Sequence, residues 1–400
     1  MCAGLGARLH RSEERVTTTD AGQLPEVAIR RGLKDVYFDR TRASYIDGRA
    51  GKLLYRGYSI HDLADHSTFE ETAYLLFYSK LPTGDELAAF EADLKASRTL
   101  PDEIFDIIHA VRHAHPMDVL RTATSALAAF DPEVNDNSIE ATVRKGVRLT
   151  AQVPTIVMAH EAIRNGRQPV APNLSLSHAA NFLYMLTGEV PTDDAARLMD
   201  KDFILHAEHG PNASAFTARV VAGTQANLHA AIVAAIGALS GPSHGGAAEN
   251  VMQMAMEIGE PENAAAYVQR LRSEGKPVMG FGHRVYKAED PRARHLREGV
   301  RRLSLEREEP KWYHILEAVQ EAMRPYARLG VHVNVDFFAG VIYYLVGFPP
   351  DLFVPIFAVG RIPGWTAQVV EQFENNILIR PLTQYVGEMD LPYIPIEERG

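Results

Sequence analysis

The sequence predicts a mostly α-helical protein, because apolar residues recur along it at helical spacing and no alternation of strands with helices is found. The clearest helix runs over residues 228–239, and Gly241-Pro242 ends it. One strand signal lies in residues 43–58, where Asp47-Gly48 separates two short aromatic and apolar runs and predicts a small β-hairpin. The expected fold is therefore all-α, with two helical domains and a small β-hairpin near the N-terminus.

Two capping boxes predict where helices begin after the hairpin. Ser67-x-x-Glu70 precedes apolar residues at helical spacing, and Thr83-x-x-Glu86 does the same just after Pro82. In a capping box the first side chain accepts a hydrogen bond from a backbone N–H that the helix leaves unpaired, and the acidic side chain accepts one from the first residue. We therefore expect helices to follow Ser67 and Thr83.

The domain organisation follows from length and from the positions of the helix breakers. A chain of 400 residues is longer than one hydrophobic core usually organises, which predicts two domains. Turns rich in glycine and proline enclose residues 246–350, which we interpret as a small domain inserted into a large one made of residues 1–245 and 351–400. Residues 1–30 are polar and aperiodic, and they predict a loose N-terminal arm.

Composition excludes several classes of function. A net charge of −10 argues against a dedicated binder of nucleic acid or of anionic membranes. The single cysteine, Cys2, allows neither an intrachain disulfide nor a thiolate zinc cage, and it fits a reducing compartment. The N-terminus lacks the apolar core of a secretory signal, and the most apolar stretches, residues 228–239 and 337–348, are too short to span a bilayer. We therefore expect a soluble, cytoplasmic protein.

Three segments depart from plain helical patterning and could carry chemistry. In Gly241-Pro-Ser-His244-Gly-Gly246 the histidine lies between helix breakers, where it could approach a ligand or form an ordinary solvated turn. The segment from Met279 to Arg292 begins with glycines and leads into a cationic run, with seven Lys/Arg against three Asp/Glu between His283 and Arg302. Such a run suits a ligand rich in phosphate and carboxylate groups, but it could also be a solvated basic helix.

The third segment is Asn334-Val-Asp336, directly before an apolar run. An aspartate in this position is typical of a helix N-cap, and it can cap a helix and still face a cleft. Arg361 and Arg380 both lie beside residues that interrupt helices. His206 and His209 are three residues apart, and since no third ligand is evident nearby, one site histidine beside one structural histidine is favoured over a metal pair.

Taken together, these segments resemble the citrate synthase family. The resemblance spans residues from about 32 to the C-terminus, and the order and spacing of the motifs make it specific. The motifs are Leu54-Tyr-Arg-Gly-Tyr58, His115-Pro-Met117, His209-Gly-Pro-Asn-Ala-Ser214, Gly241-Pro-Ser-His-Gly-Gly246, Gly280-Phe-Gly-His-Arg-Val-Tyr-Lys287 with Asp290-Pro-Arg292, Asn334-Val-Asp336, Arg361, Arg380 and the closing Pro395-Ile-Glu-Glu-Arg399.

The resemblance implies condensation of acetyl-CoA with oxaloacetate, followed by hydrolysis of citryl-CoA. His244, His283 and Asp336 match the family's catalytic positions: Asp336 as the base, His244 as the donor to the thioester oxygen, and His283 as the donor to the ketone of oxaloacetate. An acetyl methyl group is a poor carbon acid, so a base must act together with a group that stabilises the enolate oxygen. The resemblance implies no metal and no cofactor beyond the substrates.

The same resemblance assigns binding residues and an assembly. The oxaloacetate positions are His209, His283, Arg292, Arg361 and Arg380, and guanidinium groups suit its two carboxylates. Lys287 and the loop 277–282, which includes Gly280, Phe281 and Gly282, match the CoA-binding region. In the family the last arginine comes from the other subunit, so a homodimer with Arg380 donated in trans is implied. The small domain is expected to close over oxaloacetate.

The chain departs from the family pattern at Ala248, at Ala339 and at Gly210-Pro211, and these departures leave the choice of acyl-CoA open. A 2-methylcitrate synthase would apply the same residues to propionyl-CoA, because one methylene group is worth only about 1–3 kcal/mol of discrimination. Two further hypotheses fit the motifs: an enzyme that cleaves citryl-CoA, and a non-catalytic, CoA-binding regulatory relative.

Overall fold

A computed structural model of the chain describes residues 28–33 and 35–400. Within these residues it has sixteen α-helices and one three-stranded sheet, so the predicted all-α fold with a small hairpin is confirmed. Residues 41–379 form one compact unit, the body, and the described residues before 41 and after 379 form a second, the terminal unit. The loose arm predicted for residues 1–30 lies almost wholly outside the described residues.

The sheet is antiparallel and continues the predicted hairpin by one short strand. Its strands, in spatial order, are β1 (Ser44–Asp47), β2 (Lys52–Tyr55) and β3 (Tyr58–Ser59). Tyr45 pairs with Leu54 across the hairpin, and the Asp47 carboxylate accepts backbone hydrogen bonds from Arg49 and Ala50 at 2.9 Å, which fixes the turn. β3 was not predicted, because two residues are too few to show strand alternation.

The helices of the body fall into three consecutive groups. The first is α1 (Ile60–His66), α2 (Phe69–Tyr78), α3 (Gly84–Ala96), α4 (Asp102–Ala110), α5 (Pro116–Leu127), α6 (Ile139–Arg164), α7 (His178–Thr187), α8 (Asp193–His206), α9 (Ala213–Gly223) and α10 (Leu228–Leu239). The second is α11 (Ala247–Ile258), α12 (Ala264–Ser273), α13 (Ala293–Glu306), α14 (Pro310–Met323) and α15 (Asp336–Val346), and the third is α16 (Phe353–Glu374) alone. Short 3₁₀ helices lie at Arg31–Leu33, Ala128–Phe130, Pro261–Asn263, Arg324–Leu329, Pro350–Leu352 and Ile396–Glu398.

One of the two predicted capping boxes is correct and the other is shifted by one residue. Thr83 and Glu86 cap α3 as expected. At α2 the box is formed by Thr68 and Glu71, so the prediction for Ser67 and Glu70 was wrong. The Ser67 backbone N–H still bonds to Leu63 at the end of α1, and the carboxylate of Glu70 is buried, where it accepts the backbone N–H of His178 at 2.6 Å. Tertiary contacts therefore decided between two adjacent candidates with the same local pattern.

Two long helices organise the core of the body. α6 and α16 pack along each other so closely that a Cβ at Gly146 of α6 would collide with Thr366 of α16. Both are buried on most sides, as expected for helices at the centre of a large core. The predicted helix of residues 228–239 is confirmed as α10. No helix within the described residues is both long and apolar enough to cross a bilayer.

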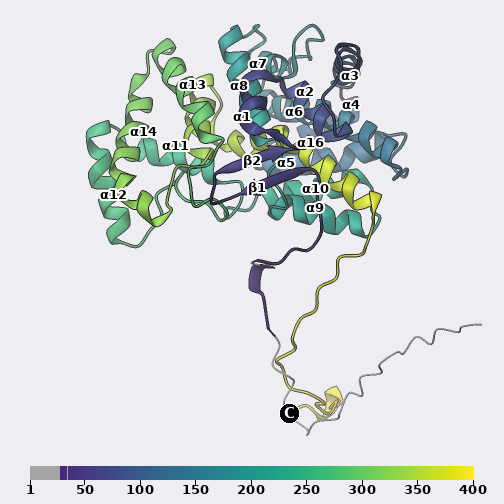
Figure 1. The fold of residues 1–400 in the computed structure, drawn as a ribbon. Coiled ribbons are helices and arrows are strands. Elements are labelled where there is room, and N and C mark those ends of the chain that lie inside the picture. The colour runs from purple at the N-terminus through teal and green to yellow at the C-terminus, as the bar shows by residue number, and fades with distance from the viewer. Residues whose placement is uncertain (1–27, 34) are drawn as a thin grey trace, which may run out of the picture. The chain divides into compact units, whose positions relative to one another are not determined.

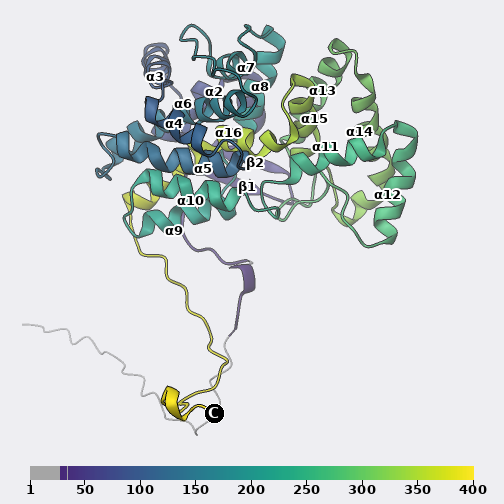
Figure 2. The same cartoon turned by 180° about the vertical axis from the view of Figure 1, so that it is seen from behind.

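Helices α11–α14 gather on one side of the body, and α1–α10 lie with α16 on the other (Figures 1 and 2). The second group packs internally through the contacts of α12 and α13 with α14 and of α11 and α13 with α15. α13 also touches α8, where a Cβ at Gly299 would collide with Leu198. The division into a large domain and a small domain of residues 246–350 remains a prediction.

Candidate active site

The chemistry-bearing residues come from five parts of the body that are distant in sequence. They are the residues after α8, the turn between α10 and α11, the loop before α13, the first residue of α15, and the middle of α16. The loop before α13 is tied to the residues before α15, since Gly282 N–H donates to His332 O at 2.8 Å and Asn334 N–H donates to Gly280 O at 2.9 Å. This pairing sets His283 and Asp336 at the ends of two hydrogen-bonded segments.

His283 has a defined proton position. Its Nδ1 accepts the backbone N–H groups of Val285 and Tyr286, at 3.0 and 3.1 Å. Because a backbone N–H can only donate, Nδ1 carries the lone pair and the ring proton is on Nε2. Burial, with Arg292 second, lowers the pKa of His283 to about 4, so the ring is neutral at neutral pH. His283 is thus a neutral hydrogen-bond donor through Nε2.

His244 is also a neutral imidazole, but its ring proton is on the other nitrogen. Its Nε2 accepts the backbone N–H of Ser214 at 3.3 Å and lies 2.8 Å from the Ser214 hydroxyl, so the ring proton is on Nδ1. Trp365 of α16 donates its indole N–H to the same hydroxyl at 3.1 Å, which fixes Ser214. Burial, then Arg361, lowers the pKa of His244 to about 4. His244 can therefore donate from Nδ1 without carrying a charge.

His209 lies beside His283, with ring centroids 5.2 Å apart. Its Nε2 is 3.0 Å from the hydroxyl of Tyr286, a buried residue whose ring also contacts His283. Burial lowers the pKa of His209 well below its ordinary value, and Arg292 is the next largest cause. The site therefore presents three neutral imidazoles, those of His209, His244 and His283.

Two buried arginines supply the positive charge of the site. Arg292 makes a bidentate ion pair with Asp290, at 2.9 and 2.7 Å. Arg361 donates from Nε to the backbone carbonyl of His206 and lies over the Phe357 ring. Burial lowers the pKa of Arg361 to about 10, opposed by the buried Glu208, so Arg361 stays charged at neutral pH. Two fixed, buried guanidinium groups suit a small dicarboxylate.

Asp336 is the first residue of α15 and makes no capping hydrogen bond, so the helix-cap interpretation is wrong. Its carboxylate accepts no hydrogen bond from the described residues. Burial raises the pKa of Asp336, while His206 and then Arg292 oppose that rise. A carboxylate with no hydrogen bonds at the positive end of a helix is available to take a proton.

The residues matched to CoA binding lie in a loop with an unusual backbone and at an exposed lysine after it. Gly280 and Gly282 have φ of +76° and +87°, and Phe281 pairs with Val333 in an isolated bridge. Lys287 is exposed, and its backbone N–H donates to Gly48 O in the hairpin turn at 2.7 Å. An open pocket of about 470 Å³ adjoins Phe281, is lined mainly by α14 and the residues after it, and includes none of the three catalytic candidates.

Arg380 is not brought to the other candidates within the body. It is an exposed residue of the terminal unit, and it makes no hydrogen bond or ion pair with a described residue. Four further residues support the site without having been assigned a role from sequence: Tyr286, Asp290, Ser214 and Trp365. Asp290 and Tyr286 stand inside the motifs that carry the resemblance, but nothing local indicates that they hold Arg292 and His209.

Comparison with known proteins identifies the family. The family model described as "Citrate synthase, C-terminal domain" matches residues 32–382. The chain is 42% identical to the citrate synthase of Haloferax volcanii over 377 residues, which is 93% of this chain and 99% of that protein. It is 41% identical to 2-methylcitrate synthase 1 of Corynebacterium glutamicum, over 93% of this chain and 98% of that protein.

A solved structure supports the same family. The ternary complex of carboxymethyl coenzyme A and oxaloacetate with the citrate synthase of the thermophilic archaeon Thermoplasma acidophilum matches with a TM-score of 0.88 and 32% identity, covering 93% of this chain and all of that one. The chain belongs to the citrate synthase family. It is an enzyme of the transferase class, with the helical fold of that family.

Proposed function

We propose that this citrate synthase family member condenses acetyl-CoA with oxaloacetate and hydrolyses the resulting citryl-CoA, with Asp336 as base and His244 and His283 as neutral donors. One observation carries the proposal: a carboxyl group without hydrogen bonds, whose pKa is raised by burial, lies in a site with two neutral imidazoles whose protons are on defined nitrogens. The substrates are those that relatives of this chain are named for or bind.

The proton positions suit the two halves of the reaction. As Asp336 removes a methyl proton, the electron pair of the C–H bond forms the enol double bond and charge moves to the thioester oxygen. His244 donates to that oxygen from Nδ1, while His283 donates from Nε2 to the ketone oxygen of oxaloacetate and polarises it for attack. Neutral donors suit both tasks, because burial disfavours the charged form of either ring.

Oxaloacetate binding is assigned to His209, His283, Arg292 and Arg361, with Arg380 from a second subunit. The arginines would each hold a carboxylate, and His209 would exchange its contact with Tyr286 for one with the substrate. Lys287 and the loop of Gly280, Phe281 and Gly282 are assigned to CoA. No cofactor is needed for this chemistry, because the thioester itself activates the methyl group.

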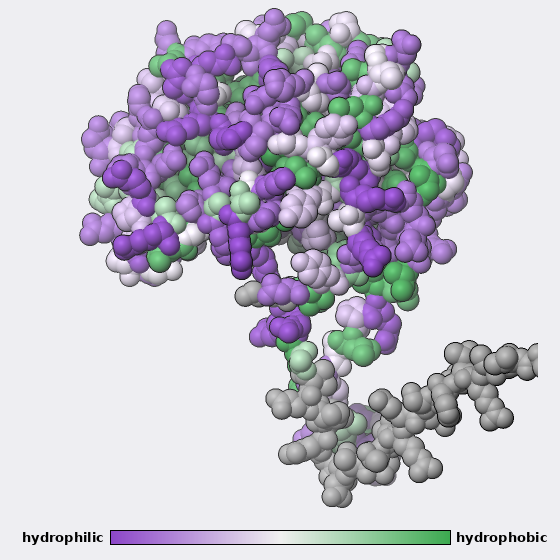
Figure 3. Space-filling view, viewed as in Figure 1, coloured by the Kyte–Doolittle hydropathy of each residue, from purple (hydrophilic) through white to green (hydrophobic). Residues whose placement is uncertain are grey.

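A homodimer is part of the proposal, and apolar surface supports it. The outward sides of α9 and α10 carry partly exposed small and apolar residues: Phe216, Val220, Val233, Ala234, Gly237 and Ala238. Large apolar side chains are exposed along the C-terminal segment: Ile377, Leu378, Leu382, Val386, Leu391, Tyr393 and Ile396. Apolar residues also interrupt the hydrophilic face drawn in Figure 3. A second copy that covers these residues would bring Arg380 into a shared site.

The proposal also includes closure of a small domain and a cytoplasmic location. Residues 246–350 form a small domain that closes on oxaloacetate and excludes water before the enol forms, with hinges near Gly245 and Pro350. A Cβ at Gly245 would collide with Leu239 O and with Val354, so the first crossing is tightly packed. A cytoplasmic location fits the single cysteine.

The base assignment is tested by Asp336→Asn. We expect proton exchange at the methyl group of an acetyl-CoA ketone analogue to fall by about 10²–10⁴-fold, and oxaloacetate affinity to change by less than about threefold. Exchange is followed by NMR in D₂O and binding by calorimetry. Asp193→Asn is the matched control, because Asp193 is likewise the first residue of a helix, α8, but is exposed. Equal loss of exchange and binding, with a lowered Tm, would contradict the assignment.

The shared site is tested by mixing inactive Asp336→Asn and Arg380→Ala chains under conditions that let subunits reassort. In a mixed dimer one site has its own Asp336 and a partner's Arg380, so recovery to roughly a quarter of wild-type activity is expected from random pairing. The control mixes Asp336→Asn with His283→Ala, which leaves a lesion in every site. If the first mixture recovers no activity while mass spectrometry confirms exchange, Arg380 serves its own chain.

The acyl-CoA preference is decided by relative rates with acetyl-CoA and propionyl-CoA. The named relatives include enzymes of both kinds at nearly equal identity, 42% and 41%. Two of the three departures from the family pattern, Ala248 and Ala339, are buried where α11 packs on α15. Faster turnover of propionyl-CoA at equal concentration would assign the chain to 2-methylcitrate synthesis.

A further inference from the structure

The β-hairpin of β1 and β2 contacts the chain beside two histidines of the site, and the mechanism above gives it no role. In Figures 1 and 2 the hairpin lies between helices α11–α14 and the helices on the other side of the body. Its strands bind the residues next to His209, and its turn binds the residues after His283. The rings of these two histidines have centroids 5.2 Å apart. One paired element therefore holds the backbone of both histidines assigned to oxaloacetate.

The strands hold the residues on either side of His209. Ser44 of β1 accepts the backbone N–H of Gly210 at 3.1 Å and donates its hydroxyl to the Glu208 carboxyl group at 2.9 Å. Tyr55 of β2 is the partner of Ser44 in the hairpin register, and its hydroxyl accepts the backbone N–H of Glu208 at 3.3 Å. Since both neighbours of His209 are bound, its backbone cannot shift without breaking contacts with the hairpin.

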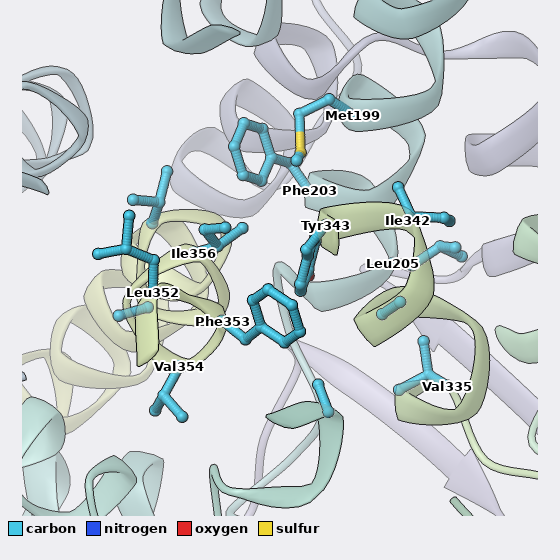
Figure 4. Close-up of a cluster of buried hydrophobic side chains, with 14 of the residues drawn as sticks. Met199, Phe203, Leu205, Val335, Ile342, Tyr343, Leu352, Phe353, Val354 and Ile356 are labelled. Carbon is cyan, nitrogen blue, oxygen red and sulfur yellow. The ribbon is translucent and has the colours of Figure 1, made fainter. Parts of the chain in front are cut away.

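The strands are themselves anchored in the core of the body. Tyr55 and Glu208 are both 0% exposed. The Tyr55 hydroxyl donates to the backbone carbonyl of Leu205 at 3.2 Å, and the Leu205 side chain lies in the buried cluster of Figure 4. The Glu208 carboxyl group also accepts the side-chain amide of Gln368, in α16, at 2.9 Å. The hairpin is therefore fixed to α8 and α16 at the end where it meets His209.

The turn of the hairpin holds residues 283–289. The backbone N–H of Lys287 donates to the Gly48 carbonyl at 2.7 Å, and the two N–H groups before it donate to Nδ1 of His283. Gly48 lies so close to these residues that an added Cβ would be 2.2 Å from the carbonyl oxygen of Val285. The φ of Gly48 is not positive, so the close approach, rather than the turn conformation, requires a glycine. The anchor to the hairpin thus directly follows the bonds that fix the His283 ring.

We propose that the β-hairpin is the positioning element of the oxaloacetate site: Ser44 and Tyr55 hold the backbone on both sides of His209, and the Gly48 carbonyl holds the residues after His283. This inference rests on the proposed function, which assigns both histidines to oxaloacetate. Ser44 and Gly48 act through the two histidines. Because the paired strands join the two points of contact, the hairpin sets the distance between the two imidazoles.

The first test is oxaloacetate affinity, measured by calorimetry in Ser44→Ala and Ser44→Thr. Alanine removes both hydrogen bonds of the hydroxyl, so we expect about threefold to tenfold weaker binding, whereas threonine keeps a hydroxyl and should restore the affinity. Ser138→Ala is the matched control, because the Ser138 hydroxyl also accepts a backbone N–H, at the start of α6. It should lower Tm without changing the affinity. The proposal is overturned by unchanged affinity in Ser44→Ala, by an equal loss in Ser44→Thr, or by an equal loss in Ser138→Ala.

The second test is Gly48→Ala. The added methyl group collides with Val285, so residues 283–289 must move away and oxaloacetate should bind about tenfold more weakly. Gly84→Ala is the matched control, because the φ of Gly84 is likewise not positive and a Cβ there would meet nothing within 4 Å. Its affinity should equal that of wild type. Unchanged affinity in a folded Gly48→Ala protein overturns the proposal, and if this variant does not fold, the Ser44 variants decide.

Double-mutant cycles separate positioning from a purely stabilising role. If Ser44 acts through His209, then Ser44→Ala should weaken oxaloacetate binding by less than about twofold in a His209→Ala protein. Gly48→Ala should cost equally little in a His283→Ala protein. A full, additive loss in either background overturns the proposal. A wild-type protein that binds no oxaloacetate contradicts the proposed function itself, whereas a wild type that binds it and shows additive losses contradicts this inference alone.

Discussion

Gly280 and Gly282 offer a matched pair that measures how tightly the CoA loop is packed against the helix of the base. Both have positive φ, +76° and +87°. A Cβ at Gly280 would lie 2.5 Å from Cδ2 and 2.8 Å from Cβ of Phe337, the neighbour of Asp336, whereas a Cβ at Gly282 would meet nothing within 4 Å. Alanine therefore adds backbone strain at both positions but a steric collision at only one.

The magnitudes follow from these contacts. A left-handed conformation costs an alanine about 1–2 kcal/mol, and overpacking a filled core costs about 1–3 kcal/mol more. We expect Gly282→Ala to lose about 1–2 kcal/mol of stability and Gly280→Ala about 2–5 kcal/mol. With an unfolding entropy of about 2.1 cal/mol/K per residue, a chain of 400 residues loses roughly 1 °C of Tm for each kcal/mol.

The assay is thermal unfolding at fixed protein concentration, combined with the rate of acetyl-CoA turnover. The difference in Tm between the two variants isolates the collision with Phe337, because the strain is common to both. Gly280→Ala should also lose more of its kcat, since relief of the collision moves Phe337 and with it Asp336. Equal losses of Tm and kcat in the two variants would refute the close packing of the loop on α15.

Three further predictions concern stability and binding. Glu371→Leu leaves the buried Arg56 without its partner at 3.1 Å and should cost about 3–5 kcal/mol, whereas Glu374→Leu, which breaks an exposed pair, should change Tm by less than about 1 °C. Burial raises the pKa of Glu70 to about 7, so the protonated carboxyl group contributes stability that is fully present below its unfolded pKa and is lost as the pH rises through about 7. Glu70→Gln should therefore flatten the decline of Tm between pH 5 and 8. An unchanged decline would contradict this reasoning. Calorimetry should show that oxaloacetate and a CoA ester tighten each other's binding by the same factor, and independence in both directions would contradict domain closure.

The sequence by itself determined the helical class, the hairpin and the family. The turn at Asp47-Gly48 and the helix of residues 228–239 were predictable, because both depend on residues close together in the chain. The order of the motifs, from His209 to Arg361, named the residues that the body then brings together. Local patterns of this kind need no knowledge of the tertiary fold.

The tertiary structure decided which of several locally equivalent residues does each task. Thr68 rather than Ser67 caps α2, because Glu70 is drawn into the core beside His178. Asp336 could have been a helix cap by sequence, but its carboxylate makes no capping bond. These outcomes depend on partners more than 100 residues away or on the exact backbone geometry, and no local pattern records either.

The sequence also could not predict which ring nitrogens of the site carry protons. The sequence names His244 and His283 but not which ring nitrogen carries the proton, which is set by backbone N–H groups that each ring faces. His206 stands three residues from His209, and only the fold shows that its ring is buried against Phe357 of α16, with Nδ1 2.9 Å from the backbone carbonyl of Asp202. Electrostatics is a matter of distance in space, and only the packing of α8, α15 and α16 fixes that distance.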